Sequence, residues 1–299
     1  MSLPLSPTLL IRLTRLLQGL EPLLARHLPG VPPSAEALRH HFAWHWQQPQ
    51  GSPGRLVPAR NPDMPLLEDL RGIDGQKHAL CANTARFALG MPANNALLWG
   101  ARGTGKSSLV KAAVCAQRHR GLHLVEIHKE DLLHLPDIIA LLAPCAARFV
   151  LFCDDLSFDE REISFKAMKA VLEGGIEARP DNILLYATSN RRHLMARTSL
   201  LDEPGSQDLG LHPQETVEEQ ISLSDRFGLW LGFHPMDHDA YMEIVRHWAL
   251  RLCLGIDPVE LERRARDWSR TRGARSGRTA VQFITDLAGL LALPEAGRD

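Results

Sequence analysis

The stretch from Gly100 to Leu109 reads GARGTGKSSL and matches the pattern G-x-x-x-x-G-K-[ST]. In this pattern a glycine-rich loop turns tightly, and its backbone N–H groups surround phosphate oxygens. Lys106 is then expected to reach the β- and γ-phosphates of a nucleotide, and the Ser107 hydroxyl to bind Mg²⁺. The sequence therefore predicts a site for the phosphates of a nucleoside triphosphate.

The sequence on each side of the loop supports this interpretation. Residues 96–99 are apolar enough for a buried strand, and KSSLVKAAVCAQRHR (106–120) has the composition of a helix, whose N-terminus favours negative charge. A glycine-rich turn without a ligand would not need this strand-loop-helix order. The residues expected to contact the nucleotide here are Gly100, Ala101, Arg102, Gly103, Thr104, Gly105, Lys106, Ser107 and Ser108.

The composition points to no particular class of partner. The chain has 299 residues, a formal net charge of -1 and 44% hydrophobic residues, so no global charge favours nucleic acid or a basic protein. Its five cysteines form no C-x-x-C pair, which is typical of a reducing compartment, and we expect a cytoplasmic protein. No apolar run approaches the roughly 18 residues of a membrane span, and residues 9–20 read as an amphipathic helix.

The hydrophobic pattern divides the chain into three regions. Residues 1–62 form an accessory region, 63–234 an α/β nucleotide-binding domain, and 235–299 a helical lid domain. In the middle region apolar strands alternate with helices, which predicts a parallel sheet. The five expected strands lie within residues 96–99, 122–128, 149–153, 182–190 and 228–233.

The accessory region contains an aromatic stretch that invites a second interpretation. His40, His41 and His45 stand beside Trp44 and Trp46, a pattern that suggests a metal site or a stacking surface. No cysteine or carboxylate nearby completes a ligand set. We therefore expect a short strand with alternating aromatic side chains.

Acidic and polar residues end two of the expected strands. FVLFCDD places Asp154 where it would hold Mg²⁺, and Asp155 where it would orient or deprotonate the attacking water. Glu160 is the alternative base. YATSN places Asn190 at the next strand end, where its amide would contact the γ-phosphate or the water.

Five segments, in order along the chain, resemble the AAA+ ATPases: GARGTGKS, FVLFCDD, TSN, SDRF and SGRTA, within Leu66 to Leu293. More narrowly, PANNALLWGARGTGKSSLVKA, LFCDDLSF, VLEGGIEARPDNILLYATSNRRHL and SLSDRFGLWLGF are similar to a bacterial family catalogued as domain of unknown function 815. The resemblance implies an AAA+ core with sheet order 5-1-4-3-2, an N-terminal helical region and a small C-terminal helical lid.

The resemblance also implies roles for single residues. Lys106 and Ser107 take the Walker A roles, Asp154 and Asp155 the Walker B roles, and Asn190 that of sensor 1. Further roles fall on Arg226 as the arginine finger, on Arg278 as sensor 2 with Arg275 as the alternative, and on Ile73 beside the adenine base.

Three functions follow as alternatives. The first is an ATP- and Mg²⁺-dependent machine that forms a ring or dimer and remodels or loads an unidentified protein partner. The second is a nucleic-acid-handling loader, suggested by seven arginines between Arg263 and Arg278, most of which are expected on a solvated helix face. The third is a small-molecule P-loop kinase, against which Asn190, Arg226 and Arg278 argue. A GTPase is disfavoured because no N-K-x-D sequence occurs.

Overall fold

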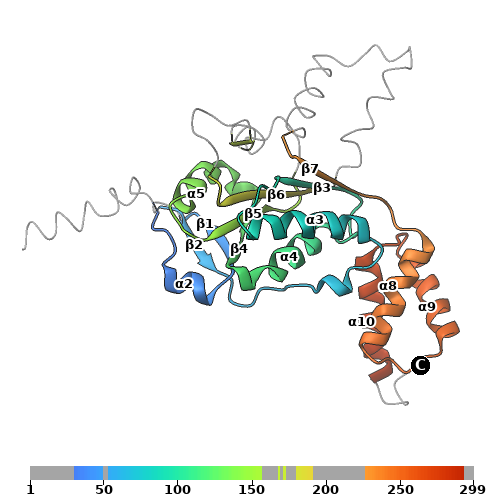
Figure 1. Cartoon of the computed structure of the whole chain (residues 1–299). Coiled ribbons are helices and arrows are strands. Elements are labelled where there is room, and N and C mark those ends of the chain that lie inside the picture. The colour runs from blue at the N-terminus through green and yellow to red at the C-terminus, as the bar shows by residue number, and fades with distance from the viewer. Residues whose placement is uncertain are drawn as a thin grey trace, which may run out of the picture.

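The fold is described from a computed structural model (Figure 1), which describes residues 30–49, 53–156, 168, 171–172, 180–190 and 226–292. Two of the expected features lie outside these residues: the amphipathic helix at 9–20 and the alternative base Glu160. What the structure describes is a central sheet with helices on both faces, and a group of three helices at the C-terminus.

The sheet has seven strands in the order β2-β1-β4-β5-β6-β3-β7. Read from β7, the last five give the expected order 5-1-4-3-2, and all of these pairs are parallel. All seven residues of β6 are buried, as expected for a parallel strand covered on both faces. The predicted α/β class is confirmed, with strands β3 (Ala96–Gly100), β4 (Leu122–Ile127), β5 (Arg148–Cys153), β6 (Ile183–Ser189) and β7 (Leu229–Phe233).

Two further strands extend the sheet beyond the five expected. β1 (Ala43–Gln47) pairs parallel with β4, and β2 (Arg55–Pro58) pairs antiparallel with β1. The expected aromatic strand therefore exists, but it joins the central sheet. The reason is visible in its pattern, because Trp44 and Trp46 lie on one face and are each only 3% exposed.

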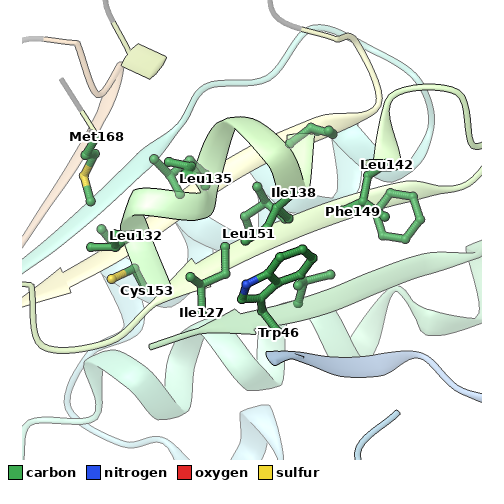
Figure 2. Packing of buried hydrophobic residues seen from close by; sticks show 14 of the residues in the cluster. Trp46, Ile127, Leu132, Leu135, Ile138, Leu142, Phe149, Leu151, Cys153 and Met168 are labelled. Carbon is green, nitrogen blue, oxygen red and sulfur yellow. The ribbon is translucent and has the colours of Figure 1, made fainter. Parts of the chain in front are cut away.

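Helices cover both faces of the sheet. α3 (Asp74–Ala88) and α4 (Lys106–Ala116) pack on one face, and α5 (Leu135–Leu142) covers the other. Figure 2 shows the second of these cores, where Trp46 and Phe149 lie among aliphatic side chains of α5 and the strands. On the first face, the Tyr186 hydroxyl lies 3.0 Å from both Asn83 Nδ2 and Thr84 Oγ1, which ties α3 to β6.

The C-terminal helices form a separate layer with its own core. They are α8 (His238–Arg251), α9 (Pro258–Thr271) and α10 (Gly277–Ala292). Asp237 and Asp257 cap the first two, because each carboxylate accepts backbone N–H groups of the first turn. Tyr241, Ala265 and Ile284 are buried between them, at most 1% exposed.

One polar cluster joins this layer to the α/β core. Asp69 is the last residue of the short helical turn Leu67–Asp69 that precedes α3, and its side chain is 6% exposed. Its Oδ1 accepts hydrogen bonds from Arg251 and, at 2.9 Å, from His247 Nε2, both on α8. Arg251 also pairs with Glu68 at 3.2 Å. We call Asp69, His247 and Arg251 the lid clamp.

Other sequence predictions concern a membrane span, a metal site and the cysteines. In the described part of the chain, no helix is both long and apolar enough to cross a bilayer. The same residues contain no group of three or more His, Cys, Asp or Glu side chains that could hold a metal, so the histidines around β1 form no such cluster. All five cysteines are free.

Candidate nucleotide-binding site

The loop between β3 and α4 has the backbone geometry that its glycines allow. Gly103 has a φ of +74°, and a Cβ there would lie 2.8 Å from Ser276 Oγ. Gly100 is tighter still, since a Cβ would meet the Phe233 carbonyl oxygen at 2.0 Å. The Ala101 N–H donates to that carbonyl at 2.9 Å. The loop is therefore held between the end of β7 and the start of α10.

Lys106 lies inside the loop and is 5% exposed. Its Nζ donates to the carbonyl oxygens of Gly100 at 3.0 Å and Ala101 at 2.7 Å, and to Asn190 Oδ1 at 2.9 Å. Burial lowers the pKa of Lys106 to about 8, although the carboxylates of Asp154 and Asp155 oppose this shift. The ammonium is therefore still protonated near neutral pH and is aimed at the loop.

Oxygen atoms suited to a divalent cation meet at the ends of α4 and β5. Ser107 Oγ donates to Asp154 Oδ1 at 2.6 Å. The Thr188 hydroxyl, at the end of β6, donates to the same oxygen and accepts the Asp155 N–H at 2.9 Å. Hydroxyl and carboxylate oxygens are the ligands that Mg²⁺ prefers, so Ser107 and Asp154 fit a magnesium site.

Asp155 stands in an uncommon backbone conformation. Its φ is +52°, in the left-handed region that only a few per cent of non-glycine residues adopt. Asn190 Nδ2 donates to Asp155 Oδ1, while Asn190 Oδ1 accepts from Lys106. Asn190 thus connects the loop lysine to the second acid. Backbone strain of this kind is concentrated at functional sites.

These residues line a cavity of about 830 Å³, large enough for a nucleotide. One end is polar and is formed by the loop, the two acids, Thr188 and Asn190. The rest of the lining comes from the segment before α3, from α8 and from α10. These residues are Asp63, Pro65, Asp69, Leu70, Arg71, Ile73, Ile244, Trp248, Gly277, Arg278, Val281 and Gln282.

Sequence reasoning missed several of these residues. Ile244 and Trp248 sit four positions apart on α8, so they share one helix face, but the same spacing also describes an ordinary core stripe. Thr188 lies in the quoted TSN segment, and nothing in its type marks it as a bridge between two aspartates. Arg71 lines the cavity, and its Nε is buried with no hydrogen-bond partner among the described residues.

The structure places the remaining predicted residues as follows. Ile73 and Arg278 both line the cavity, and the Arg278 N–H donates to Gly103 O at 3.3 Å. Arg275, the alternative to Arg278, is not among the lining residues of this cavity. Arg226 is exposed and precedes β7.

The position of Arg226 relative to the loop follows from the strand register. β7 runs parallel to β3, with Leu229 opposite Ala96 and Phe233 opposite Gly100. Arg226 therefore stands at the end of the sheet opposite its own loop. Since seven residues separate it from Phe233, the rise per residue of a strand puts it on the order of 20 Å from that loop.

Comparison with known proteins gives one family. The model described as "Protein of unknown function (DUF815)" matches residues 39–291. No curated protein matches the chain.

Among solved structures, the Holliday junction branch migration motor RuvB of Thermotoga maritima is 17% identical, with a TM-score of 0.42 and coverage of 74% of this chain and 71% of that one. AMPPCP-bound DnaA from Aquifex aeolicus is 16% identical, with a TM-score of 0.49 and coverage of 79% and 66%. The Aeropyrum pernix ORC1 protein in complex with DNA is 12% identical, with a TM-score of 0.42 and coverage of 76% and 69%.

Proposed function

We propose that this chain, which belongs to the DUF815 family of proteins of unknown function, is a magnesium-dependent ATPase of the AAA+ kind. The observation that carries the proposal is the meeting of three pairs in one cavity. Lys106 contacts the loop carbonyls, Ser107 contacts Asp154, and Asn190 contacts Asp155. Each pair supplies one requirement of phosphoanhydride hydrolysis: a cation, a metal site and a base.

The phosphates are bound by the loop and the first turn of α4. Backbone N–H groups of the loop and the helix N-terminus supply positive potential without a desolvation cost at the moment of reaction. Lys106 exchanges its two carbonyl partners for phosphate oxygens, which restores a full counter-charge to a buried ammonium. Mg²⁺, held by Ser107 and Asp154, would neutralise charge on the β- and γ-phosphates.

The attacking water is positioned by Asp155 and Asn190. Asp155 has a left-handed backbone, and its carboxylate accepts a hydrogen bond from the Asn190 amide. In this role the carboxylate accepts the proton of the water, and the Asn190 amide orients it. Thr188 is a positioning residue, because its hydroxyl holds the Asp154 carboxylate and the Asp155 N–H in place.

We also infer that hydrolysis requires a second copy of the chain. Arg226 stands at the far end of the sheet from its own loop and is exposed, so it is placed to complete a neighbouring site in a ring or dimer. Arginine suits this role because it is always charged and forks two hydrogen bonds. A client that assembles the chains would then control hydrolysis. The client is a protein in the first instance, with nucleic acid as the alternative.

Phosphate release separates this proposal from a small-molecule kinase. Purified chain with ATP and Mg²⁺ but no acceptor should release inorganic phosphate. Lys106→Ala should lose nucleotide binding, whereas Asp155→Asn should bind ATP and turn over about 10²-fold more slowly. Unchanged ATP affinity in Lys106→Ala, measured by calorimetry, would contradict the site assignment.

A mixing experiment tests the second copy. Arg226→Ala and Lys106→Ala are each expected to be inactive, and an equal mixture should regain activity at interfaces that carry both intact residues. Normal turnover by Arg226→Ala alone, at concentrations where the native chain assembles, would contradict the role of Arg226. The slow Asp155→Asn variant with ATP is then the form with which to capture the client.

A further inference from the structure

The seven arginines near the C-terminus separate into two groups in the structure. Arg263 pairs with Glu260 and Asp267 along α9, and Arg264 and Arg266 pair with glutamates one turn earlier. The Arg272 guanidinium lies over the Trp268 ring at 4.9 Å. These four arginines have partners within the lid. The other three are Arg270, Arg275 and Arg278, which form no ion pair with any described residue.

The three remaining arginines line a second cavity. It has a volume of about 580 Å³ and lies between the nucleotide loop, the chain before α8 and the turn from α9 to α10. Arg102 of the loop lines it as well, so four arginines line one cavity. None of its lining residues is acidic. Four like charges in this arrangement repel one another, and a bound anion would relieve the repulsion.

The second cavity shares a wall with the nucleotide cavity. Arg102, Gly103 and Arg278 line both. The loop packs directly on the start of α10, where a Cβ on Gly103 would lie 2.8 Å from Ser276 Oγ. The charges of Arg102 and Arg278 also act on the nucleotide cavity. Burial is the main cause of the lowered pKa of Lys106, and these two arginines lower that pKa further.

The lining indicates which kind of anion fits. Arginine forks match phosphate and carboxylate groups alike. A chain of phosphates, however, places several charges within one small volume, whereas carboxylates are carried on separate side chains. The lining contains no aromatic residue on which a base could stack, and its apolar members include Pro235 and Met236. The cavity therefore suits linked phosphate groups and has no surface that reads a base.

We propose that Arg102, Arg270, Arg275 and Arg278 form a second anion site, which binds linked phosphate groups beside the nucleotide site. Two sources share this chemistry, a free polyphosphate and the phosphodiester backbone of a nucleic acid. The site shares Arg102 and Arg278 with the nucleotide cavity, and anion binding there does not depend on whether the first cavity hydrolyses ATP.

Inorganic tripolyphosphate is the probe, and Lys106→Ala is the background, because this variant removes binding at the loop. Calorimetry on the full-length Lys106→Ala chain should still show one tripolyphosphate site. Adding Arg270→Glu should weaken that binding by roughly tenfold or more, since one charge-assisted contact is replaced by repulsion. Arg263→Glu is the matched control, because it makes the same charge change on the same helix outside the cavity, and its effect should be under about twofold.

Three results would overturn the proposal. The first is no tripolyphosphate binding in the Lys106→Ala background at an unchanged melting temperature. The second is equal weakening by Arg270→Glu and Arg263→Glu, which would indicate a diffuse charge effect. The third is tighter binding of a glutamate peptide of equal charge. Displacement of tripolyphosphate by a single-stranded oligonucleotide would identify nucleic acid as the source, and failure to displace it would identify a free polyphosphate. A finding that the chain does not hydrolyse ATP would by itself neither support nor contradict the second anion site.

Discussion

Asp69→Asn removes the central charge of the lid clamp while keeping the shape of the side chain. The Asp69 carboxylate is 6% exposed and accepts from Arg251 and from His247, so the amide loses a charge-assisted acceptor at a nearly buried position. Hydrogen bonds to charged groups contribute about 1.5–3 kcal/mol each. Arg251 is 34% exposed and keeps Glu68 as a partner, so the loss of its hydrogen bond to Asp69 costs less than the loss of a fully buried one. We expect the attachment of the lid to weaken by about 2 kcal/mol.

The weakened clamp should appear as lower nucleotide affinity. Ile244 and Trp248 of α8 line the cavity together with Asp69 itself, so we expect ATP to bind fully only when the lid is attached. A loss of 2 kcal/mol limits the rise in the Kd for ATP to about 30-fold, and it reaches this limit only if the detached lid becomes the main state.

Calorimetric titration of ATP into the full chain measures this effect. Asp267→Asn is the control, because Asp267 is 55% exposed, pairs with Arg263 at 3.4 Å and should change the Kd by less than about twofold. A Kd for Asp69→Asn equal to that of the control would refute the coupling between the clamp and the site.

Two further predictions use the same titration, and a third uses thermal unfolding. Because burial lowers the pKa of Lys106 to about 8 and phosphates should raise it again, ATP affinity should fall as the pH rises above 8 and change little between neutral pH and pH 8, with proton uptake on binding near pH 8. A flat profile from neutral pH to pH 9.5 would contradict this. Trp248→Ala should weaken ATP binding about tenfold and tripolyphosphate binding hardly at all, because we expect Trp248 to contact the base and not the phosphates. Equal losses for both ligands would argue against a base contact. Gly103→Ala should lower the melting temperature by roughly 2–6 °C, because φ is +74° there and the added Cβ meets Ser276; an unchanged melting curve would show that the loop can shift.

The sequence predicted the features that depend on local patterns. Apolar runs ending in Asp155 and Asn190 identified adjacent parallel strands, and these two side chains meet because the carboxyl ends of such strands share an edge. The glycines of the loop likewise indicate where the backbone turns tightly. These relations involve short stretches, so residue type and order are enough to find them.

What the sequence did not predict depends on contacts between distant segments. The lid clamp joins Asp69 to His247 and Arg251, which follow it by 178 and 182 positions in the sequence. No local sequence pattern identifies an aspartate as the partner of a helix so far along the chain. The second cavity arises the same way, since Arg102 and Arg270 meet only through the packing of the loop on the lid. The sequence predicted a solvated helix face for most of the seven arginines and a nucleotide contact for Arg278 or Arg275. Only the structure shows which of the others pair along α9 and that Arg270 lines the second cavity.

The placement of β1 and β2 decides where the chain can be cut. A protein that begins at residue 63, at the boundary suggested by the sequence, would lack both strands and leave the backbone of β4 unpaired along one side. It would also remove Trp44 and Trp46 from the core that they share with α5, and so leave Phe149 and Ile138 open to water. An unpaired strand next to newly exposed apolar surface is a template for aggregation. Shortened forms intended for crystallisation or assays should therefore retain both β1 and β2.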